Sequence, residues 1–290
     1  MQGKGYKRNR YKKVEKHIVS RTEYRNKSVQ MGNGLCSPRD ETNCNSLLKE
    51  ASMTYVISDI HGEYDMFEEL LGKIRFCDRD RLFVLGDMID RGPDPIKVVR
   101  KLMTMPNAVC LAGNHELMAM ECLGFLMREI TESTLGELNE DMLDRILTWQ
   151  YNGSKTTIEA FRKLDKQGRN EVLEFLEDLS VYEEVSIGEN NYILVHAGLG
   201  NFSPGKSLEE YSLEELVWER PDYGKQYFNN RYVVAGHTPT QTIEENPRPG
   251  FVYRTNNHIA IDCGACFEGG RLAALCLETG EAFYSSENKA

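Results

Sequence analysis

The sequence predicts an α/β protein in which strands and helices alternate along the chain. Three apolar segments, at 55–58, 82–85 and 108–111, each precede a stretch whose apolar residues recur at helical spacing. This strand–helix–strand order is typical of neighbouring parallel strands in one sheet. The chain has 290 residues, 40% of them hydrophobic, which is enough for one large domain with a substantial core.

The helices between these strands are expected at about 66–75 and 95–103. A long helical stretch begins at Glu116, and MLDRILTWQ and NEVLEFLEDL predict further helices within 117–180 because their apolar residues recur at helical spacing. Strands return at NYILVH and RYVVAGH, and the C-terminal part alternates again through HIAIDCG, RLAALCLE and EAFYS. A helical segment therefore separates two groups of strands.

Residues 1–52 differ in character from the rest of the chain. They contain 12 Lys and Arg and 5 Asp and Glu, a net charge of +7, without a periodic apolar pattern. We expect a basic, disordered N-terminal extension, with the folded domain at 53–290. Met53 stands directly before the first strand and resembles a natural start, so an upstream start codon is the alternative origin of this segment. A partner- or RNA-binding arm is less favoured.

Charge and cysteine usage limit the classes of partner. The remaining residues, 23 basic and 40 acidic, carry a net charge of −17, which disfavours nucleic acid as the main partner and favours divalent cations. No segment approaches the ~20 apolar residues of a membrane span, and no apolar stretch follows the basic start, so neither a membrane nor secretion is expected. The eight cysteines are scattered, and we interpret Cys263 and Cys266 as packing or turn residues in a reduced, cytoplasmic setting.

The segment YVISDIHGEYD contains the first functional signal. Its strand ends at Asp59 and His61, which are followed by Gly62, a residue that lets the backbone turn sharply. Side chains at i and i+2 lie on the same side of an extended chain, so this carboxylate and imidazole can share one metal ion. An Asp-x-His pair is common by chance, and the signal depends on the other strands.

Four more apolar strands end on a residue that can bind metal, in each case near a glycine. They are LGDMIDRG with Asp87, LAGNHE with Asn114, ILVHAG with His196 and VVAGHT with His237. Ligands in α/β sheets gather outside the carboxyl ends of strands. We therefore expect these four residues to lie beside Asp59 and His61.

The composition of this set predicts two metal ions. Six ligands that mix carboxylate, imidazole and amide oxygen are too many for one small ion, and Asp87 is the expected bridge. Ligands of this kind without thiolate favour Mn²⁺ first, with Fe or Zn²⁺ as alternatives. Two divalent or trivalent ions ~3.5–4 Å apart suit phosphoester hydrolysis. Four of the six histidines lie in these motifs; of the other two, His258 precedes a strand and is interpreted as structural, and His17 lies in the extension.

The motifs DIHG, GDMIDRG, GNHE, LVHAG and GHT occur in this order between Asp59 and Thr238. They resemble the calcineurin-like metallophosphoesterase superfamily, and most closely its bacterial and phage PPP-type serine/threonine protein phosphatases. The resemblance covers nearly all of 53–285. It implies a catalytic domain with a central β-sandwich of two mixed sheets flanked by helices, and a helical insertion at 117–180 near the active site. WQYNGSKTTIEAF resembles a segment of bacterial relatives, so it is expected to form a pocket wall or a packed loop.

The resemblance also implies a role for each motif residue. The first metal would be held by Asp59, His61 and Asp87, and the second by Asp87, Asn114, His196 and His237. A metal-bridging hydroxide would then attack phosphorus in line.

Protonation and phosphate binding are assigned by the same resemblance. His115 would protonate the leaving alkoxide, and Asp90 would orient His115 and favour its charged form. Arg91 would bind phosphate oxygens with its planar guanidinium, and Arg220, in LVWERPD, would contact the phosphate from the other side. Glu116 is expected to be a carboxylate in the first turn of a helix.

Three functions are consistent with these motifs. The first is hydrolysis of phosphoserine and phosphothreonine in a phosphoprotein or phosphopeptide, because Asp90 and His115 supply the acid that an alkoxide requires. The alternative is a dinucleoside polyphosphate hydrolase acting on diadenosine tetraphosphate; such relatives share the fold and the metals but usually differ at the positions of Asp90 and Glu116. A non-enzymatic binding protein on this fold is remote, because every ligand residue is present.

Overall fold

The computed structural model describes residues 52–126 and 139–289. The predicted extension, apart from residue 52, and part of the predicted insertion lie outside this range. The described residues form two five-stranded mixed sheets with helices around them, as predicted. Within these two ranges no helix is both long and apolar enough to cross a membrane.

The first sheet carries the three predicted strand–helix units. Its order is β10–β9–β1–β2–β3, with β1, β2 and β3 parallel and the C-terminal pair antiparallel. The strands are β1 (Thr54–Ile57), β2 (Arg81–Val84), β3 (Ala108–Cys110), β9 (Ala273–Cys276) and β10 (Ala282–Tyr284). The parallel register ends all three N-terminal strands at the same edge of the sheet.

The second sheet follows the helical segment. Its order is β4–β5–β6–β8–β7, with β5, β6 and β8 parallel and the two outer strands antiparallel. The strands are β4 (Tyr182–Ile187), β5 (Asn190–Val195), β6 (Arg231–Ala235), β7 (Tyr253–Thr255) and β8 (His258–Ala260). The edge strands β4 and β7 were not predicted, because YEEVSI and YRT offer little continuous apolar sequence.

Alternating side chains make the two sheets a sandwich. Val56 and Phe83 of the first sheet pack with Leu194 and Val234 of the second in one apolar cluster between the sheets. Their neighbours along the strands, such as Ile57, belong to a larger cluster shared with the helices. This period of two is the expected consequence of successive strand side chains pointing to opposite faces.

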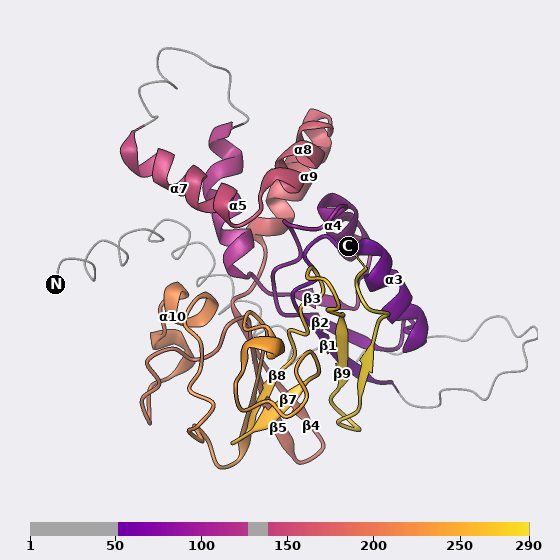
Figure 1. Ribbon diagram of the computed structural model, residues 1–290, viewed down its shortest axis with the longest axis vertical. Helices are drawn as coiled ribbons and strands as arrows, with labels where there is room; N and C mark the ends of the chain where they lie inside the picture. The colour runs from indigo at the N-terminus through magenta and orange to yellow at the C-terminus, as the bar shows by residue number, and fades with distance from the viewer. Residues whose placement is uncertain (1–51, 127–138, 290) are drawn as a thin grey trace, which may run out of the picture.

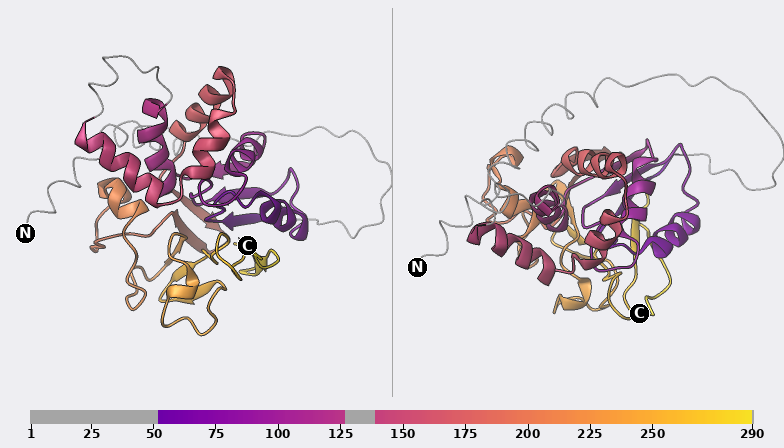
Figure 2. Two further views of the ribbon diagram at one scale, coloured as in Figure 1. Left: turned by 45° about the horizontal axis from the view of Figure 1, so that its top comes forward. Right: turned by 90° about the horizontal axis from the view of Figure 1, so that it is seen from above.

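The helices cover the first sheet and one end of the sandwich (Figure 1). They are α3 (Tyr64–Lys73), α4 (Pro95–Met103), α5 (Asn114–Leu126), α7 (Glu140–Tyr151), α8 (Lys155–Arg162), α9 (Lys166–Glu177) and the short α10 (Leu213–Val217). The inserted helices α7, α8 and α9 pack on α4 and α5, and the left view of Figure 2 shows them above the strands. Asn139 and Asp165 accept backbone N–H groups at the starts of α7 and α9, which fixes where these helices begin.

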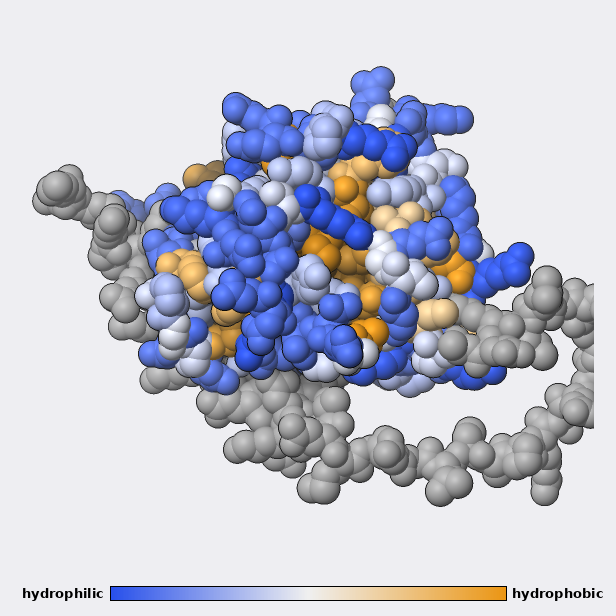
Figure 3. All heavy atoms as spheres, turned by 90° about the horizontal axis from the view of Figure 1, so that it is seen from below, coloured by the Kyte–Doolittle hydropathy of each residue, from blue (hydrophilic) through white to orange (hydrophobic). Residues whose placement is uncertain are grey.

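The amino ends of the strands form the opposite side of the molecule. A pocket of about 430 Å³ lies there, with Tyr192, Tyr232, Arg254 and Leu277 among its lining residues and none of the predicted site residues. Seen from below, hydrophilic residues cover most of the surface and hydrophobic residues gather in a narrow band (Figure 3). The predicted site residues lie away from this pocket, at the carboxyl ends of the strands.

Candidate active site

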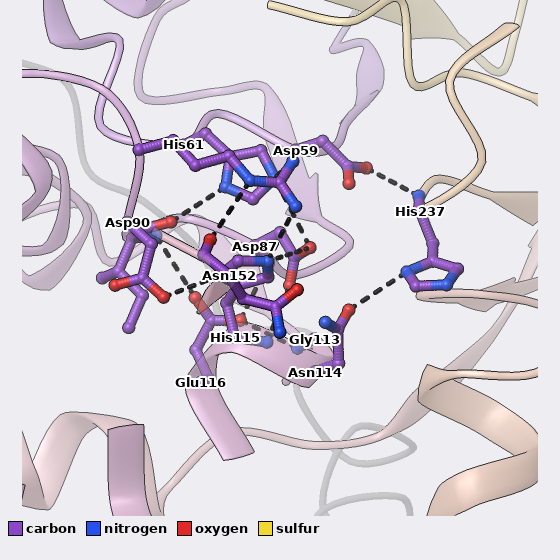
Figure 4. Close-up of polar contacts among 12 residues, drawn as sticks. Asp59, His61, Asp87, Asp90, Gly113, Asn114, His115, Glu116, Asn152 and His237 are labelled. Carbon is purple, nitrogen blue, oxygen red and sulfur yellow. Dashed lines mark hydrogen bonds and ion pairs between the residues drawn. The ribbon is translucent and has the colours of Figure 1, made fainter. Parts of the chain in front are cut away.

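The five predicted strand ends meet where the two sheets approach each other; Figure 4 shows four of them through Asp59, Asp87, Asn114 and His237, and His196 lies beside Asp87 and Asn114. The backbone N–H of His237, after β6, donates to Asp59 Oδ2, after β1, over 2.9 Å. Gly236 makes this approach possible, because a Cβ there would lie 2.0 Å from Asp59 Oδ2 and 1.9 Å from Ser58 Oγ. The contact joins one sheet to the other directly at the site.

Four of the predicted ligand residues adopt left-handed backbone conformations. They are Asp59 (φ 52°), His61 (φ 47°), Asp87 (φ 52°) and His237 (φ 62°). Such conformations cost about 1–3 kcal/mol each in a non-glycine residue and persist only where surrounding contacts fix them. The backbone N–H of His61 donates to the Asp87 carbonyl over 2.8 Å, which links the first two of these turns.

Asp87 lies at the centre of the site. Its Oδ2 is 3.6 Å from His61 Nε2, 3.4 Å from His196 Nε2 and 3.8 Å from His115 Nε2. Its side chain is almost completely buried. Burial acts to raise the pKa of Asp87, but the positive charges of His196 and His115 hold this pKa well below its usual range. One ionised carboxylate is therefore surrounded by three imidazoles.

Backbone carbonyls set the tautomers of two of these histidines. His61 Nδ1 donates to the Ile89 carbonyl over 2.9 Å, and His196 Nδ1 donates to the Leu85 carbonyl over 2.7 Å. A carbonyl only accepts, so Nδ1 carries a proton in both rings, and in the neutral imidazole Nε2 would present its lone pair to the site. Histidines that bind metal ions are oriented by such partners.

Asn114 and His237 complete the second half of the site. Asn114 Oδ1 is 3.0 Å from both His196 Nε2 and His237 Nδ1. Burial is the main reason that the pKa of His237 falls to about 3, with the charge of His196 adding to it. For His196 the charges of Asp87 and Asp59 outweigh burial and raise the pKa to about 10.

Two groups of side chains bring their ligand atoms within 4.8 Å of one another, and they share Asp87. They are His61, Asp87 and His115, and Asp87, His196 and His237. The donors are carboxylate oxygens and imidazole nitrogens, and the fixed tautomers turn lone pairs inward. The cluster is thus able to hold a dinuclear metal centre.

Asp59 belongs to neither group. Its carboxylate accepts the Ser58 hydroxyl and the His237 N–H, and His115 stands beside His61 and Asp87 in the first group. Burial raises the pKa of Asp59 to about 6. The structure brings Asp59 to the edge of the site and leaves its role as a ligand a prediction.

The predicted acid pair is present and buried. His115 Nδ1 donates to Asp90 Oδ2 over 2.6 Å, and both side chains are fully buried. His115 Nε2 therefore points into the site, where Arg91 Nη2 lies 3.1 Å away. Asp90 also accepts hydrogen bonds from Trp149 and Thr157, two residues of the inserted helices.

The two predicted arginines lie at different sides of the site. Arg91 Nη1 donates to His61 Nε2 over 2.9 Å. Its guanidinium also contacts Cys266 Sγ at 3.6 Å and lies 5.8 Å from the ring centre of Phe267, which is 46% exposed. Arg220, exposed after α10, contributes positive charge that lowers the pKa of His237, so it lies on the His237 side.

Glu116 does more than the predicted helix-end carboxylate. It is fully buried and accepts the backbone N–H groups of Asp87 and Met88 at 2.8 Å and of Gly113 at 2.9 Å. It therefore ties the turn after β2 to the turn after β3. The only sequence signal for this role was its place directly after Asn114 and His115.

Sequence reasoning also missed residues near Arg91. Trp149 is completely buried, which agrees with the packed-loop alternative for its segment, whereas Tyr151 is 93% exposed. Cys266 and Phe267 belong to the loop after the second sheet and were not predicted to reach the site. His258 lies outside it and bonds to the Lys225 carbonyl, as expected of a structural histidine.

The fold and the site define a metal-dependent phosphoesterase. Residues 53–258 match the family described as calcineurin-like phosphoesterase, and the chain belongs to this family. The match falls inside the predicted catalytic domain at 53–290.

Two relatives that are similar to this chain are named as bis(5'-nucleosyl)-tetraphosphatases. The chain is 28% identical over 248 residues to the asymmetrical bis(5'-nucleosyl)-tetraphosphatase PrpE of Halalkalibacterium halodurans, covering 76% of this chain and 88% of that protein. It is 33% identical over 114 residues to the symmetrical bis(5'-nucleosyl)-tetraphosphatase of Erwinia tasmaniensis, covering 38% of this chain and 42% of that protein. Both relatives are named for the activity that stands as the alternative prediction for this chain.

This chain shares its fold with solved structures of a putative diadenosine tetraphosphatase and of a serine/threonine phosphatase. A putative diadenosine tetraphosphatase superposes with a TM-score of 0.58 at 18% identity, covering 84% of this chain and 97% of that chain. A serine/threonine phosphatase from Saccharomyces cerevisiae superposes with a TM-score of 0.53 at 15% identity, covering 82% of this chain and 81% of that chain. At these identities the likeness shows the fold alone.

Proposed function

We propose that this chain hydrolyses dinucleoside polyphosphates such as diadenosine tetraphosphate, cleaving them asymmetrically into two unequal nucleotides. The observation that carries the proposal is the similarity to the asymmetrical tetraphosphatase, which extends over 88% of that relative. The similarity to the symmetrical enzyme of Erwinia tasmaniensis covers 42% of that protein and therefore weighs less.

The residues around Asp87 are proposed to bind two metal ions. The first set is Asp59, His61 and Asp87, and the second is Asp87, Asn114, His196 and His237. The inward lone pairs of His61 and His196 support this assignment. Manganese is the proposed metal, with iron or zinc as alternatives. When bound, such ions supply an activated water and neutralise charge on the phosphates.

The chain's own residues then act on the phosphate that is attacked. Arg91 binds its oxygens, because the guanidinium lies at the site and is pinned at its backbone by Gly153. Arg220 contacts the phosphate chain from the His237 side. His115 Nε2 delivers a proton to the leaving oxygen, and Asp90 holds the imidazole through Nδ1.

Phe267 is the proposed stacking partner for one nucleobase of the dinucleotide. A half-exposed aromatic ring 5.8 Å from the Arg91 guanidinium suits stacking with a planar nucleobase whose phosphates are bound by that arginine. Aromatic–base stacking of this kind is worth about 1–3 kcal/mol per base.

The second candidate is the hydrolysis of phosphoserine and phosphothreonine. The observation that favours it is the buried Asp90–His115 pair, because an alkoxide leaving group depends on a proton more than a nucleotide does. The two candidates share the metals and differ in what lies beyond the phosphate.

A paired assay distinguishes the two. The full chain with Mn²⁺ is given diadenosine tetraphosphate in one arm and a phosphoserine/phosphothreonine peptide in the other. The proposal predicts a higher kcat/KM on the dinucleotide, and a higher kcat/KM on the peptide would assign the second candidate. Asp87→Asn serves in both arms as the control for contaminating phosphatase.

A further inference from the structure

We infer that Trp149 and Thr157, which lie on the inserted helices, are positioning residues for the acid His115. The inference rests on the proposed proton transfer from His115 and assigns the insertion a part in it. Both carboxylate oxygens of Asp90 are bound from the insertion side. Trp149 Nε1 donates to Asp90 Oδ2 over 2.7 Å, and the Thr157 hydroxyl donates to Asp90 Oδ1 over 2.5 Å.

These contacts and two further ones bind both carboxylate oxygens and the backbone N–H of Asp90. Its Oδ2 is shared by Trp149 and His115, whose Nδ1 lies 2.6 Å away. Its backbone N–H donates to the Thr157 hydroxyl oxygen over 2.9 Å, so one hydroxyl both accepts from and donates to the same residue. A carboxylate held at both oxygens and at its backbone cannot rotate away from the imidazole.

Burial makes each of these donors significant. Asp90 and Trp149 have no exposed surface, and Thr157 has 1%. Water does not reach these groups to replace a lost hydrogen bond, and a buried polar group without a partner is unfavourable. The indole N–H of Trp149 and the hydroxyl of Thr157 therefore belong to a hydrogen-bond network around Asp90 that is shielded from solvent.

The insertion also holds the backbone beside this network. Asp90 (φ 69°) and Arg91 (φ 65°) are consecutive left-handed residues. The Arg91 N–H donates to the Gly153 carbonyl over 3.0 Å, between the helices that carry Trp149 and Thr157. A side chain at Gly153 would bring Cβ within 2.9 Å of Arg91 Cγ, so the insertion packs directly on the turn.

It follows that the insertion helps to set the protonation geometry of the reaction. With Asp90 fixed, His115 keeps its Nδ1–H bonded to the carboxylate, and the second proton of the imidazolium, on Nε2, is aimed at the leaving oxygen. Loss of either donor frees Asp90 to turn, and the imidazole loses its orientation. If the insertion only packed against the domain, substitution would affect all substrates alike.

The test compares leaving groups in the full-length chain with Mn²⁺. The variants are Trp149→Phe and Thr157→Val, each of which removes one donor and keeps most of the side-chain volume. Thr157→Ser restores the hydroxyl, and Phe161→Leu is the control for buried packing on the same insertion. Turnover is measured with two substrates. Phenyl phosphate releases phenolate, a poor leaving group, and 2,4-dinitrophenyl phosphate releases a phenolate that needs little proton donation.

We expect Trp149→Phe and Thr157→Val to lower kcat for phenyl phosphate about tenfold or more, part of the ~10²–10⁴-fold range of acid catalysis, with little change for the dinitrophenyl ester. Thr157→Ser should restore most of the rate, and Phe161→Leu should change both substrates equally. Equal losses on both substrates, or no loss on either, would overturn the inference.

His115→Asn separates this inference from the proposed acid role. If His115→Asn shows no leaving-group dependence, the role of His115 itself is wrong. If it shows the dependence and the two donor variants do not, only the positioning role is wrong. The low-field proton resonance of His115 Nδ1, identified by its loss in His115→Asn, gives a readout without turnover. It should shift in both donor variants and stay unchanged in Phe161→Leu, and an unchanged resonance in the donor variants would also overturn the inference.

Discussion

Replacing Glu116 by glutamine tests whether this buried carboxylate holds the site together. Its Oε2 accepts the backbone N–H groups of Asp87 and Gly113, and its Oε1 accepts that of Met88 and, over 3.4 Å, that of Ile89. An amide has one accepting oxygen and one donating nitrogen. The favoured orientation keeps the oxygen toward Asp87 and Gly113 and turns the amide nitrogen toward the Met88 N–H.

The structure gives the magnitude of the expected loss. The buried Met88 N–H loses its acceptor, which costs about 1–3 kcal/mol, and the Ile89 N–H loses its longer contact to the same oxygen. The amide N–H of the glutamine would also face the Met88 N–H, donor against donor. We therefore expect the free energy of unfolding to fall by about 2–3 kcal/mol, the upper end of this range. Because Asp87 is tied to this network, a displacement of its carboxylate toward 1 Å would lower turnover by up to about 10²-fold.

Urea unfolding and turnover with Mn²⁺ measure the two effects. Glu171→Gln is the matched control, because Glu171 is an exposed residue of α9 that accepts from Gln167, and it should change stability by less than about 0.5 kcal/mol. If Glu116→Gln were as stable and as active as Glu171→Gln, the carboxylate would not be holding the two turns.

Three further substitutions test individual roles. His115→Asn should lower turnover of a poor leaving group by roughly 10²–10⁴-fold while metal content stays the same, and unchanged turnover would remove His115 from the mechanism. Asp87→Asn should lose bound metal and activity together, measured by elemental analysis of the dialysed protein; an active variant with two bound ions would refute the shared ligand. Phe267→Ala should raise KM for diadenosine tetraphosphate about 5–100-fold, the equivalent of one stacked base, and leave kcat/KM for 4-nitrophenyl phosphate unchanged. An unchanged KM for the dinucleotide would argue against base stacking at Phe267.

The strand-end residues were predictable because their signals are local. Asp59 follows β1 after a single serine, and His237 follows β6 after a single glycine, so the sequence shows each residue next to the apolar run that positions it. That two sheets rather than one supply these ends does not show in any single segment. It came from the family resemblance, and the structure confirms it.

Contacts between distant segments could not be predicted in the same way. Trp149 and Thr157 lie 59 and 67 residues from Asp90, and nothing in their own segment indicates that a carboxylate will meet them. Helical spacing in MLDRILTWQ includes Trp149 among the apolar residues, which agrees with its burial but says nothing of its hydrogen bond. Cys266 reaches Arg91 from 175 residues away by the same kind of long-range packing.

The proposed reaction itself is tested by product analysis in ¹⁸O-labelled water. The full chain is incubated with diadenosine tetraphosphate and Mn²⁺, and the products are separated and weighed by mass spectrometry. The account predicts AMP and ATP in equal amounts, with one ¹⁸O in one of them and no reaction in Asp87→Asn. Intact dinucleotide, under conditions where the same preparation dephosphorylates a phosphoserine peptide, would contradict it.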